Sequence, residues 1–248
     1  VGVVYFVPRG IIRRRRESQQ RKIDKMKQVF FTNVSHELRT PLSLIISPLA
    51  GIINNETDDN LRKKLKLINR NAMKLLEIIN QMLDLRRLMV NSEHLQLTRG
   101  DIVQFVRGIC DQFLQMTDKN ITLTFHSTMS EMLMNFDCDK LGKIVNNMLS
   151  NAFKFTQNGG RVGVSLNLID DKKHEGVKLL ELKVSDNGIG ISDEDKSHIF
   201  ERFYQAGNHK NHGGSGIGLN LVNEYTRMHG GKASVVDNPG GGTVFIVT

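Results

Sequence analysis

The chain has 248 residues, a hydrophobic fraction of 39% and a formal net charge of +8. This length suits one large or two ordinary domains. The charge does not indicate nucleic-acid binding, because residues 9–27 hold nine basic and two acidic side chains, whereas the remainder holds 25 and 24. The sequence has no tryptophan, so a stacking platform for bases is not indicated either. Cys110 and Cys138 lack metal-ligand spacing and indicate reduced thiols in a cytosolic compartment.

Residues 1–17 form a short apolar run followed by four consecutive arginines, Arg13 to Arg16. The run is too short to cross a bilayer. We favour the end of a transmembrane helix, with the arginines as its cytoplasmic flank. The alternative is vector sequence, because Val7-Pro8-Arg9-Gly10 resembles a thrombin site that lacks its usual leucine and serine.

Residues 18–55 have apolar side chains at steps of three and four, which predicts an amphipathic helix that two prolines interrupt. His36 and Glu37 fall off the apolar stripe, and Thr40 lies one turn after the histidine on the same face. Pro41 cannot donate to the carbonyl of Glu37, so we expect a bend just after the histidine. The pattern combines a nucleophilic imidazole, a carboxylate and a hydroxyl; the alternative is an ordinary surface histidine.

A second helix follows the polar turn of residues 54–60 and carries a heptad seam. The seam consists of Leu61, Leu65, Ile68, Ala72, Leu75, Ile79 and Met82. Two helices cannot bury such a stripe, so we expect a homodimer with a four-helix bundle. The alternative is packing against the next domain of the same chain.

Beyond residue 93 the sequence mixes strands and helices without regular βαβ repetition, which predicts an α+β sandwich with helices on one sheet face. The expected strands are residues 121–125, 133–136, 161–169, 177–185, 232–236 and 243–247. The expected helices are residues 102–116, capped by Asp101, 139–155 and 216–229.

Asn147, Asn151 and Lys154 recur at steps of four and three and share one face of the helix over residues 139–155. Amide oxygens there can hold Mg²⁺, which takes oxygen ligands and keeps waters. The lysine can supply a point charge to phosphates. The alternative is a polar helix surface.

Asp186-Asn187-Gly188-Ile189-Gly190 directly follows an expected strand. A carboxylate at a strand end can accept a hydrogen bond from an exocyclic amine, and the glycines let the backbone approach a ring. The stretch is not the dinucleotide fingerprint, whose glycines open a helix. The alternative is a simple turn.

Two stretches near the end of the chain flank a polar segment, residues 205–212, that has the composition of a lid. The first, residues 199–204, resembles the F box of sensor histidine kinases, and the resemblance implies that Phe200 and Phe203 anchor the lid and that Arg202 approaches phosphate. In the second, the glycines expose backbone N–H groups at a helix start, which can bind an anion. Those glycines include Gly214, Gly216 and Gly218. We interpret the metal-like spacing of His209 and His212 as accidental.

Ser35-His36-Glu37-Leu38-Arg39-Thr40-Pro41-Leu42 resembles the H box of two-component sensor histidine kinases. The later stretches resemble their N, G1, F and G2 boxes, in that order. The resemblance implies that His36 accepts the γ-phosphoryl group of ATP, that Glu37 is the general base, and that Thr40 positions water for a phosphatase reaction.

The resemblance also implies a nucleotide site. Asn151 would bind Mg²⁺, Asn147 and Lys154 would lie near the phosphates, Phe155 would pack beside the base, and Asp186 would read the adenine amine. The other implied nucleotide-binding residues are Gly188, Gly190, Arg202, Gly214, Gly216, Gly218 and Leu219.

The fold implied is a helical hairpin over residues 18–92, dimerising into a four-helix bundle, and a Bergerat-type ATP-binding domain over residues 93–248. Implied partners are a second copy and a response-regulator receiver domain, separate or fused. The implied location is the cytoplasmic part of a bacterial inner-membrane sensor. Rivals are a degenerate kinase acting as a scaffold and a gyrase-like ATPase. The latter uses a glutamate near the start of the N box, where this chain has Asn147.

Overall fold

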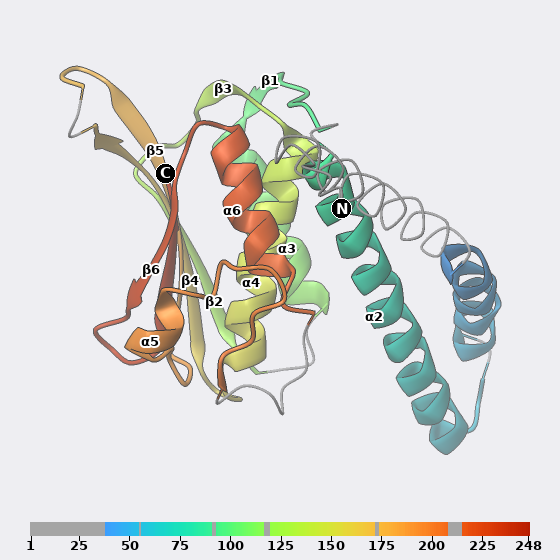
Figure 1. Cartoon of the computed structure of the whole chain (residues 1–248). Helices are drawn as coiled ribbons and strands as arrows, with labels where there is room; N and C mark the ends of the chain where they lie inside the picture. Colours follow the sequence, from blue (N-terminus) through green and yellow to red (C-terminus); the bar gives the residue numbers. More distant parts are fainter. Residues whose placement is uncertain (1–37, 55, 91–92, 117–119, 172–173, 208–214) are drawn as a thin grey trace, which may run out of the picture. The chain divides into compact units, whose positions relative to one another are not determined.

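The computed structural model describes residues 38–54, 56–90, 93–116, 120–171, 174–207 and 215–248 (Figure 1). The chain divides into two compact units, Val1–Val90 and Asn91–Thr248. Within the described ranges, no helix combines the length and the apolar character that a membrane span needs.

The first unit is a helical hairpin, as predicted: one helix covers residues 38–54, and α2 covers Asp59–Met89. Asp58 caps α2, because its side chain accepts hydrogen bonds from the backbone N–H groups of Asn60 (2.8 Å) and Leu61 (3.3 Å). Buried Leu42 from the first helix packs with Ala72 and Ile79 of α2, and the half-buried Ile46 and Leu76 extend this core.

The first helix continues through Pro41 and Pro48, so the expectation that both prolines interrupt it is wrong. Each proline removes one backbone hydrogen bond. Each is followed by a buried leucine, Leu42 at 7% and Leu49 at 8% exposure, and tertiary packing of an apolar face supplies most of a helix's stability in a protein. The bend expected just after His36 falls outside the described residues.

The second unit is built on a five-stranded sheet in the order β2-β4-β5-β7-β6. Its strands are β2 (Thr122–Ser127), β4 (Arg161–Asp170), β5 (Lys178–Asp186), β6 (Ala233–Asp237) and β7 (Thr243–Val247). β2 pairs with β4 in parallel, and the other neighbours are antiparallel. A separate antiparallel pair joins β1 (Thr98–Asp101) to β3 (Leu133–Phe136).

Helices α3 (Ile102–Met116), α4 (Cys138–Phe155) and α6 (Gly218–Met228) lie over one face of the sheet (Figure 1). The core lies between these helices and the sheet, where residues of both are fully buried. Examples are Val145 and Met148 of α4, Leu166 of β4 and Val184 of β5. The predicted α+β sandwich is confirmed. The sequence analysis missed β1 and the short helix α5 (Asp193–Lys196).

Two aspartates begin the helices that support the site. Oδ1 of Asp101 accepts from the N–H groups of Val103 and Met132, both at 3.0 Å, at the start of α3. Asp137 caps α4, where its Oδ1 accepts from the N–H of Lys140 at 3.0 Å. The cap at Asp101 agrees with the prediction, and α4 begins one residue earlier than expected, at Cys138.

Candidate functional site

The predicted site residues His36, Glu37 and Gly214 lie outside the described ranges, as do His209 and His212, whose spacing we interpreted as accidental. Thr40 is described, and its side chain is exposed on the helix over residues 38–54. The geometry that follows therefore concerns the second unit, where most of the predicted nucleotide-binding residues lie.

The amide-bearing face of α4 contacts the start of α6. Nδ2 of Asn147 donates to the carbonyl of Lys143 at 2.7 Å, which fixes the amide on the helix surface. Its Oδ1 then lies 2.5 Å from the position that a Cβ atom on Gly218 would occupy, so only glycine fits there without a shift. The predicted N and G2 stretches, about seventy residues apart in the numbering, are thus in direct contact.

The next turns of α4 present half-buried Asn151, Lys154 and Phe155. Nζ of Lys154 lies 4.6 Å from the centroid of the Phe155 ring, within range of a cation–π interaction. A Cβ atom on Gly188 would overlap the Phe155 carbonyl, so the loop after β5 packs against the end of α4. The lysine, the ring and the glycine loop therefore share one region.

Asp186 ends β5 and is 4% exposed. Its Oδ1 accepts from the N–H groups of Gly188 (2.9 Å) and Thr243 (3.3 Å). Burial raises the pKa of this carboxyl, and the two backbone hydrogen bonds oppose that rise. The described residues give no hydrogen bond to Oδ2, which leaves that oxygen available for a ligand donor.

The segment containing Phe200 and Phe203 is anchored through its backbone and through Tyr204. The Phe203 N–H donates to the Gly216 carbonyl at 2.9 Å, and Nδ2 of Asn220 on α6 donates to the Phe200 carbonyl at 2.9 Å. The Phe203 side chain is 60% exposed, so the described contact of this residue with the start of α6 is made by its backbone. Its φ of 62° lies in the left-handed region, which residues other than glycine rarely adopt.

Tyr204 holds the same segment to α5. Its hydroxyl donates to Oδ1 of Asp195 at 2.6 Å, and this hydrogen bond raises the pKa of the tyrosine to about 12. Neither residue was predicted from the sequence as part of the site, although Tyr204 ends the F-box stretch. Arg202 is exposed, and its approach to phosphate stays a prediction.

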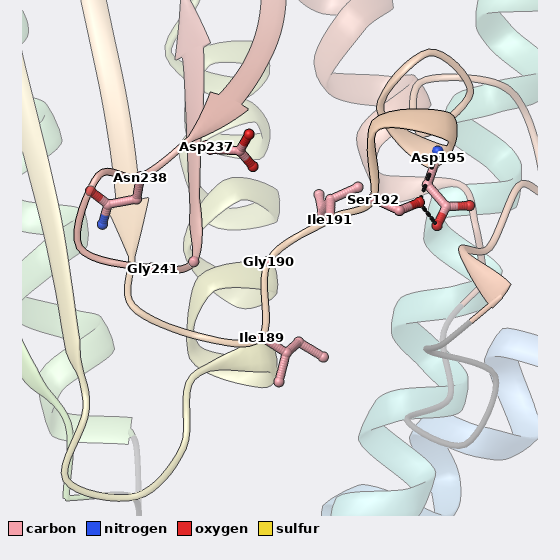
Figure 2. A pocket seen from close by; sticks show the side chains of 9 residues that line it. Ile189, Gly190, Ile191, Ser192, Asp195, Asp237, Asn238 and Gly241 are labelled. Carbon is pink, nitrogen blue, oxygen red and sulfur yellow. Dashed lines mark hydrogen bonds between the residues drawn. The ribbon is translucent and has the colours of Figure 1, made fainter.

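A cavity of about 510 Å³ is lined by the loop after β5, the start of α5 and the turn between β6 and β7 (Figure 2). The lining residues are Ile189, Gly190, Ile191, Ser192, Asp195, Asp237, Asn238, Gly241 and Gly242. The β6–β7 turn was not predicted as part of the site. Its local signals are those of a turn, namely Asn238-Pro239 and the glycine run Gly240 to Gly242 before the last strand.

The described residues contain no cluster of three or more His, Cys, Asp or Glu side chains suited to a metal. A cation here would need amide oxygens, phosphate oxygens and waters. Half-buried Asn151, on the same helix face as Asn147, fits a Mg²⁺ ion that keeps several waters.

Two family models match the chain. The His Kinase A (phospho-acceptor) domain matches residues 26–89, and the ATPase shared by histidine kinases, DNA gyrase B and HSP90 matches residues 136–248. Sensor histidine kinase TmoS of Ectopseudomonas mendocina is 41% identical over 92% of this chain and 23% of its own length. The chain belongs to the sensor histidine kinase family.

Hybrid signal transduction histidine kinase D of Dictyostelium discoideum is 37% identical over 91% of this histidine kinase chain. The chain spans 15% of that relative's length. Full-length ShkA, solved in complex with AMPPNP, has a TM-score of 0.67 and 25% identity over 88% of this chain and 44% of its own. The mycobacterial sensor histidine kinase MprB has a TM-score of 0.51 and 28% identity over 61% of this chain and 95% of its own.

The predicted family and fold are therefore confirmed: this histidine kinase chain carries a phosphoacceptor domain and an ATPase domain, the two parts of a protein-histidine kinase.

Proposed function

We propose that this chain is the kinase core of a sensor protein, which binds ATP in its second unit and transfers the γ-phosphoryl group to His36. The observation that carries the proposal is the convergence of three stretches around the end of α4. Asn147 contacts the start of α6, and the Phe155 carbonyl contacts Gly188. Asp186 is held at the centre of the same region.

Each group in this region has a proposed task. Oδ2 of Asp186 accepts the exocyclic amine of adenine, and Phe155 packs beside the base. Asn147, Lys154 and Arg202 lie near the phosphates, while the helix start at Gly218 offers backbone N–H groups. Asn151 would hold a Mg²⁺ ion through its amide oxygen, and the ion would supply positive charge to the phosphates. The AMPPNP in full-length ShkA supports an adenine nucleotide as the ligand here.

The phosphotransfer step rests on the H-box resemblance. An imidazole nitrogen of His36 attacks the γ-phosphorus in line, the bond from phosphorus to the bridging oxygen breaks, and ADP leaves. The imidazole proton passes to Glu37. The phosphoramidate is a high-energy bond, so the phosphoryl group can move on to an aspartate of a response regulator. Thr40, exposed on its helix, positions a water molecule for the opposing phosphatase reaction, in which the phosphoryl group is hydrolysed.

Asn147 favours transfer over ATP hydrolysis. The gyrase-like relatives of this fold use a glutamate near the N-box start to activate water, and an amide cannot accept a proton in this way. The tethering of the Asn147 amide to Lys143 and against Gly218 supports a binding role instead.

The assembly proposed is a homodimer through residues 18–92, with residues 93–248 as the ATP-binding domain. Residues 1–17 are proposed to lie next to a membrane anchor, which makes this chain the cytoplasmic part of an inner-membrane sensor. A receiver domain, separate or fused, takes the phosphoryl group. The hybrid kinase relative supports the fused alternative.

The test is the replacement His36→Gln in the whole chain. We expect acid-labile labelling from γ-labelled ATP to disappear while ATP affinity is unchanged. His126→Gln is the matched control, because His126 is an exposed histidine on β2, away from the predicted boxes. Residual labelling of the first variant, or loss of labelling in the control, would contradict the assignment.

A further inference from the structure

The peptide unit that joins Asp186 to Asn187 has both of its polar atoms held from outside its own loop. Its N–H, on Asn187, donates to the carbonyl of Arg161 on β4 at 3.2 Å. Its carbonyl, on Asp186, accepts from Nδ2 of Asn238 at 2.8 Å, a side chain 52 residues further along the chain. The plane of this peptide is therefore set by the sheet on one side and by the β6–β7 turn on the other.

The turn that carries Asn238 is itself rigidly placed. The Asn238 N–H donates to the Gly242 carbonyl at 3.1 Å, and the Asn238 carbonyl accepts from the Gly241 N–H at 2.8 Å. Gly242 has a φ of 91°, and a Cβ atom there would overlap the Asp186 carbonyl. The backbone of the turn therefore approaches Asp186 as closely as glycine allows.

The same turn leads into β7, whose first residue, Thr243, donates its N–H to Oδ1 of Asp186 at 3.3 Å. Asn238 thus fixes the main chain of Asp186 while Thr243 fixes its carboxylate. If the Asn238 amide were removed, the Asp186 carbonyl would lose its partner and the peptide could rotate. The carboxylate attached to that residue would then be held less precisely.

We infer that Asn238 is a positioning residue for base recognition: by fixing the Asp186 carbonyl, it presents the Asp186 carboxylate to the exocyclic amine of adenine and so sets the preference for adenine over guanine. This inference rests on the proposed ATP-binding function. Guanine carries a carbonyl oxygen where adenine carries the amine, and a well-placed carboxylate repels that oxygen. A loosely held carboxylate both binds the amine less well and rejects the oxygen less well.

The experiment is calorimetric titration of the full chain with ATP and, separately, GTP in the presence of Mg²⁺. Asn238→Ala removes one neutral hydrogen bond, so we expect ATP affinity to fall about three- to tenfold and the ratio of ATP to GTP affinity to shrink with it. Asn238→Asp keeps the side-chain size but faces the Asp186 carbonyl with an acceptor, so it should shrink the ratio further.

Gly240→Ala is the matched control in the same turn, because Gly240 does not line the cavity and nothing lies within 4 Å of its added Cβ atom. Thermal unfolding without nucleotide, measured for every variant, reports any general loss of the turn. We expect the control to keep the wild-type ratio of affinities.

The titrations distinguish a failure of the proposed ATP-binding function from a failure of the role of Asn238. A wild-type chain that binds no ATP overturns the proposed function itself. A wild type that binds ATP, with an unchanged ratio in Asn238→Ala, overturns the role of Asn238 alone. A control that shrinks the ratio as much as Asn238→Ala also overturns that role, because the stability of the turn, and not the amide, would then set the preference.

Discussion

Contacts between glycines and polar groups define the nucleotide region at the scale of single residues. Gly218 begins α6 at a position where most side chains would serve a helix better than glycine. Its missing Cβ gives Oδ1 of Asn147 the room it occupies. Glycine lowers the stability of the helix, but its missing Cβ atom lets the Asn147 amide keep a fixed position, which we propose to lie near the phosphates.

Gly218→Ala should therefore separate stability from binding. Alanine favours the helix by up to about 1 kcal/mol, but its Cβ would displace the Asn147 amide. We expect an unfolding midpoint close to wild type and an ATP affinity reduced about tenfold, which is about 1.4 kcal/mol. Nucleotide titration and thermal unfolding measure the two effects.

Gly108→Ala on α3 is the matched control, because nothing lies within 4 Å of its added Cβ. It should stabilise the chain by about 0.5–1 kcal/mol and leave ATP affinity unchanged. An ATP affinity of Gly218→Ala equal to wild type would show that the close approach does not matter for binding.

At the scale of elements, the start of α4 is tied to the segment before β1 by a buried ion cluster. Nζ of Lys140 lies 3.0 Å from Oδ2 of Asp137 and 3.2 Å from Oε2 of Glu93. The same Oδ2 accepts from the N–H of Gln96 at 2.8 Å. Asp137 and Lys140 are 2% and 5% exposed. This cluster holds residues 93–96 against the domain that binds the nucleotide.

The cluster predicts acid sensitivity. Burial alone would raise the pKa of Asp137, but hydrogen bonds from the Gln96 N–H, the Lys140 N–H and the Lys140 side chain outweigh it and lower the pKa to about 2. The folded-state pKa lies below the ordinary value of 3.8. The carboxylate therefore stabilises the fold above about pH 4, and this contribution is lost as pH falls through about 2.

Urea unfolding of the full chain between pH 2 and pH 6 tests this prediction on wild type and Asp137→Asn. The pKa difference corresponds to about 2 kcal/mol, so the free energy of unfolding of wild type should exceed that of the variant by about this amount at pH 6, with the gap closing toward pH 2. Asp139→Asn, which alters an exposed pair with Lys143 on the same helix, should change stability by less than about 0.5 kcal/mol. A gap independent of pH would contradict the assigned role of the Asp137 charge.

At the scale of the whole molecule, the heptad seam of α2 is only partly covered within one chain. Ala72 and Ile79 are buried in the hairpin core, whereas Leu61, Ile68 and Leu75 are 43%, 52% and 47% exposed. The first helix adds further exposed apolar side chains, namely Leu38, Leu44, Ile45 and Ile52. Large exposed apolar patches are uncommon on monomers, so we propose that a second copy covers this one.

Leu75→Asp should give monomers that bind ATP but phosphorylate poorly. In one chain the side chain at this position is half exposed, so the substitution is tolerated there. In the four-helix bundle the two carboxylates would be buried without partners, at a cost of several kcal/mol. Light scattering at micromolar concentration measures the assembly.

Leu67→Asp is the matched control for assembly. Leu67 is 57% exposed, and its neighbours one turn away on α2 are Lys63, Lys64, Arg70 and Asn71. It should leave the mass of the particle unchanged. A monomeric wild type, or equal dissociation by the two variants, would count against the proposed bundle.

Most of the helices and strands and the residue types of the five boxes could be predicted from the sequence, because both depend on residues close together in the chain. Periodicity predicted α2, and a strand pattern predicted β3 with the bounds that the structure has. A capping aspartate placed the start of α3 at Ile102. The five boxes identified the family because each motif is local and their order along the chain is itself a signal.

The contacts between these local features could not be predicted from the sequence, because they depend on the packing of the folded chain. The pairing of β1 with β3, the contact of Gly218 with Asn147 and the hydrogen bond from Asn238 to Asp186 join residues far apart in the chain. Pro41 and Pro48 stayed within a helix although their local preference is to end one. In each case the outcome depends on how sheet order and side-chain packing bring distant backbones together, and no short window of residues contains that information.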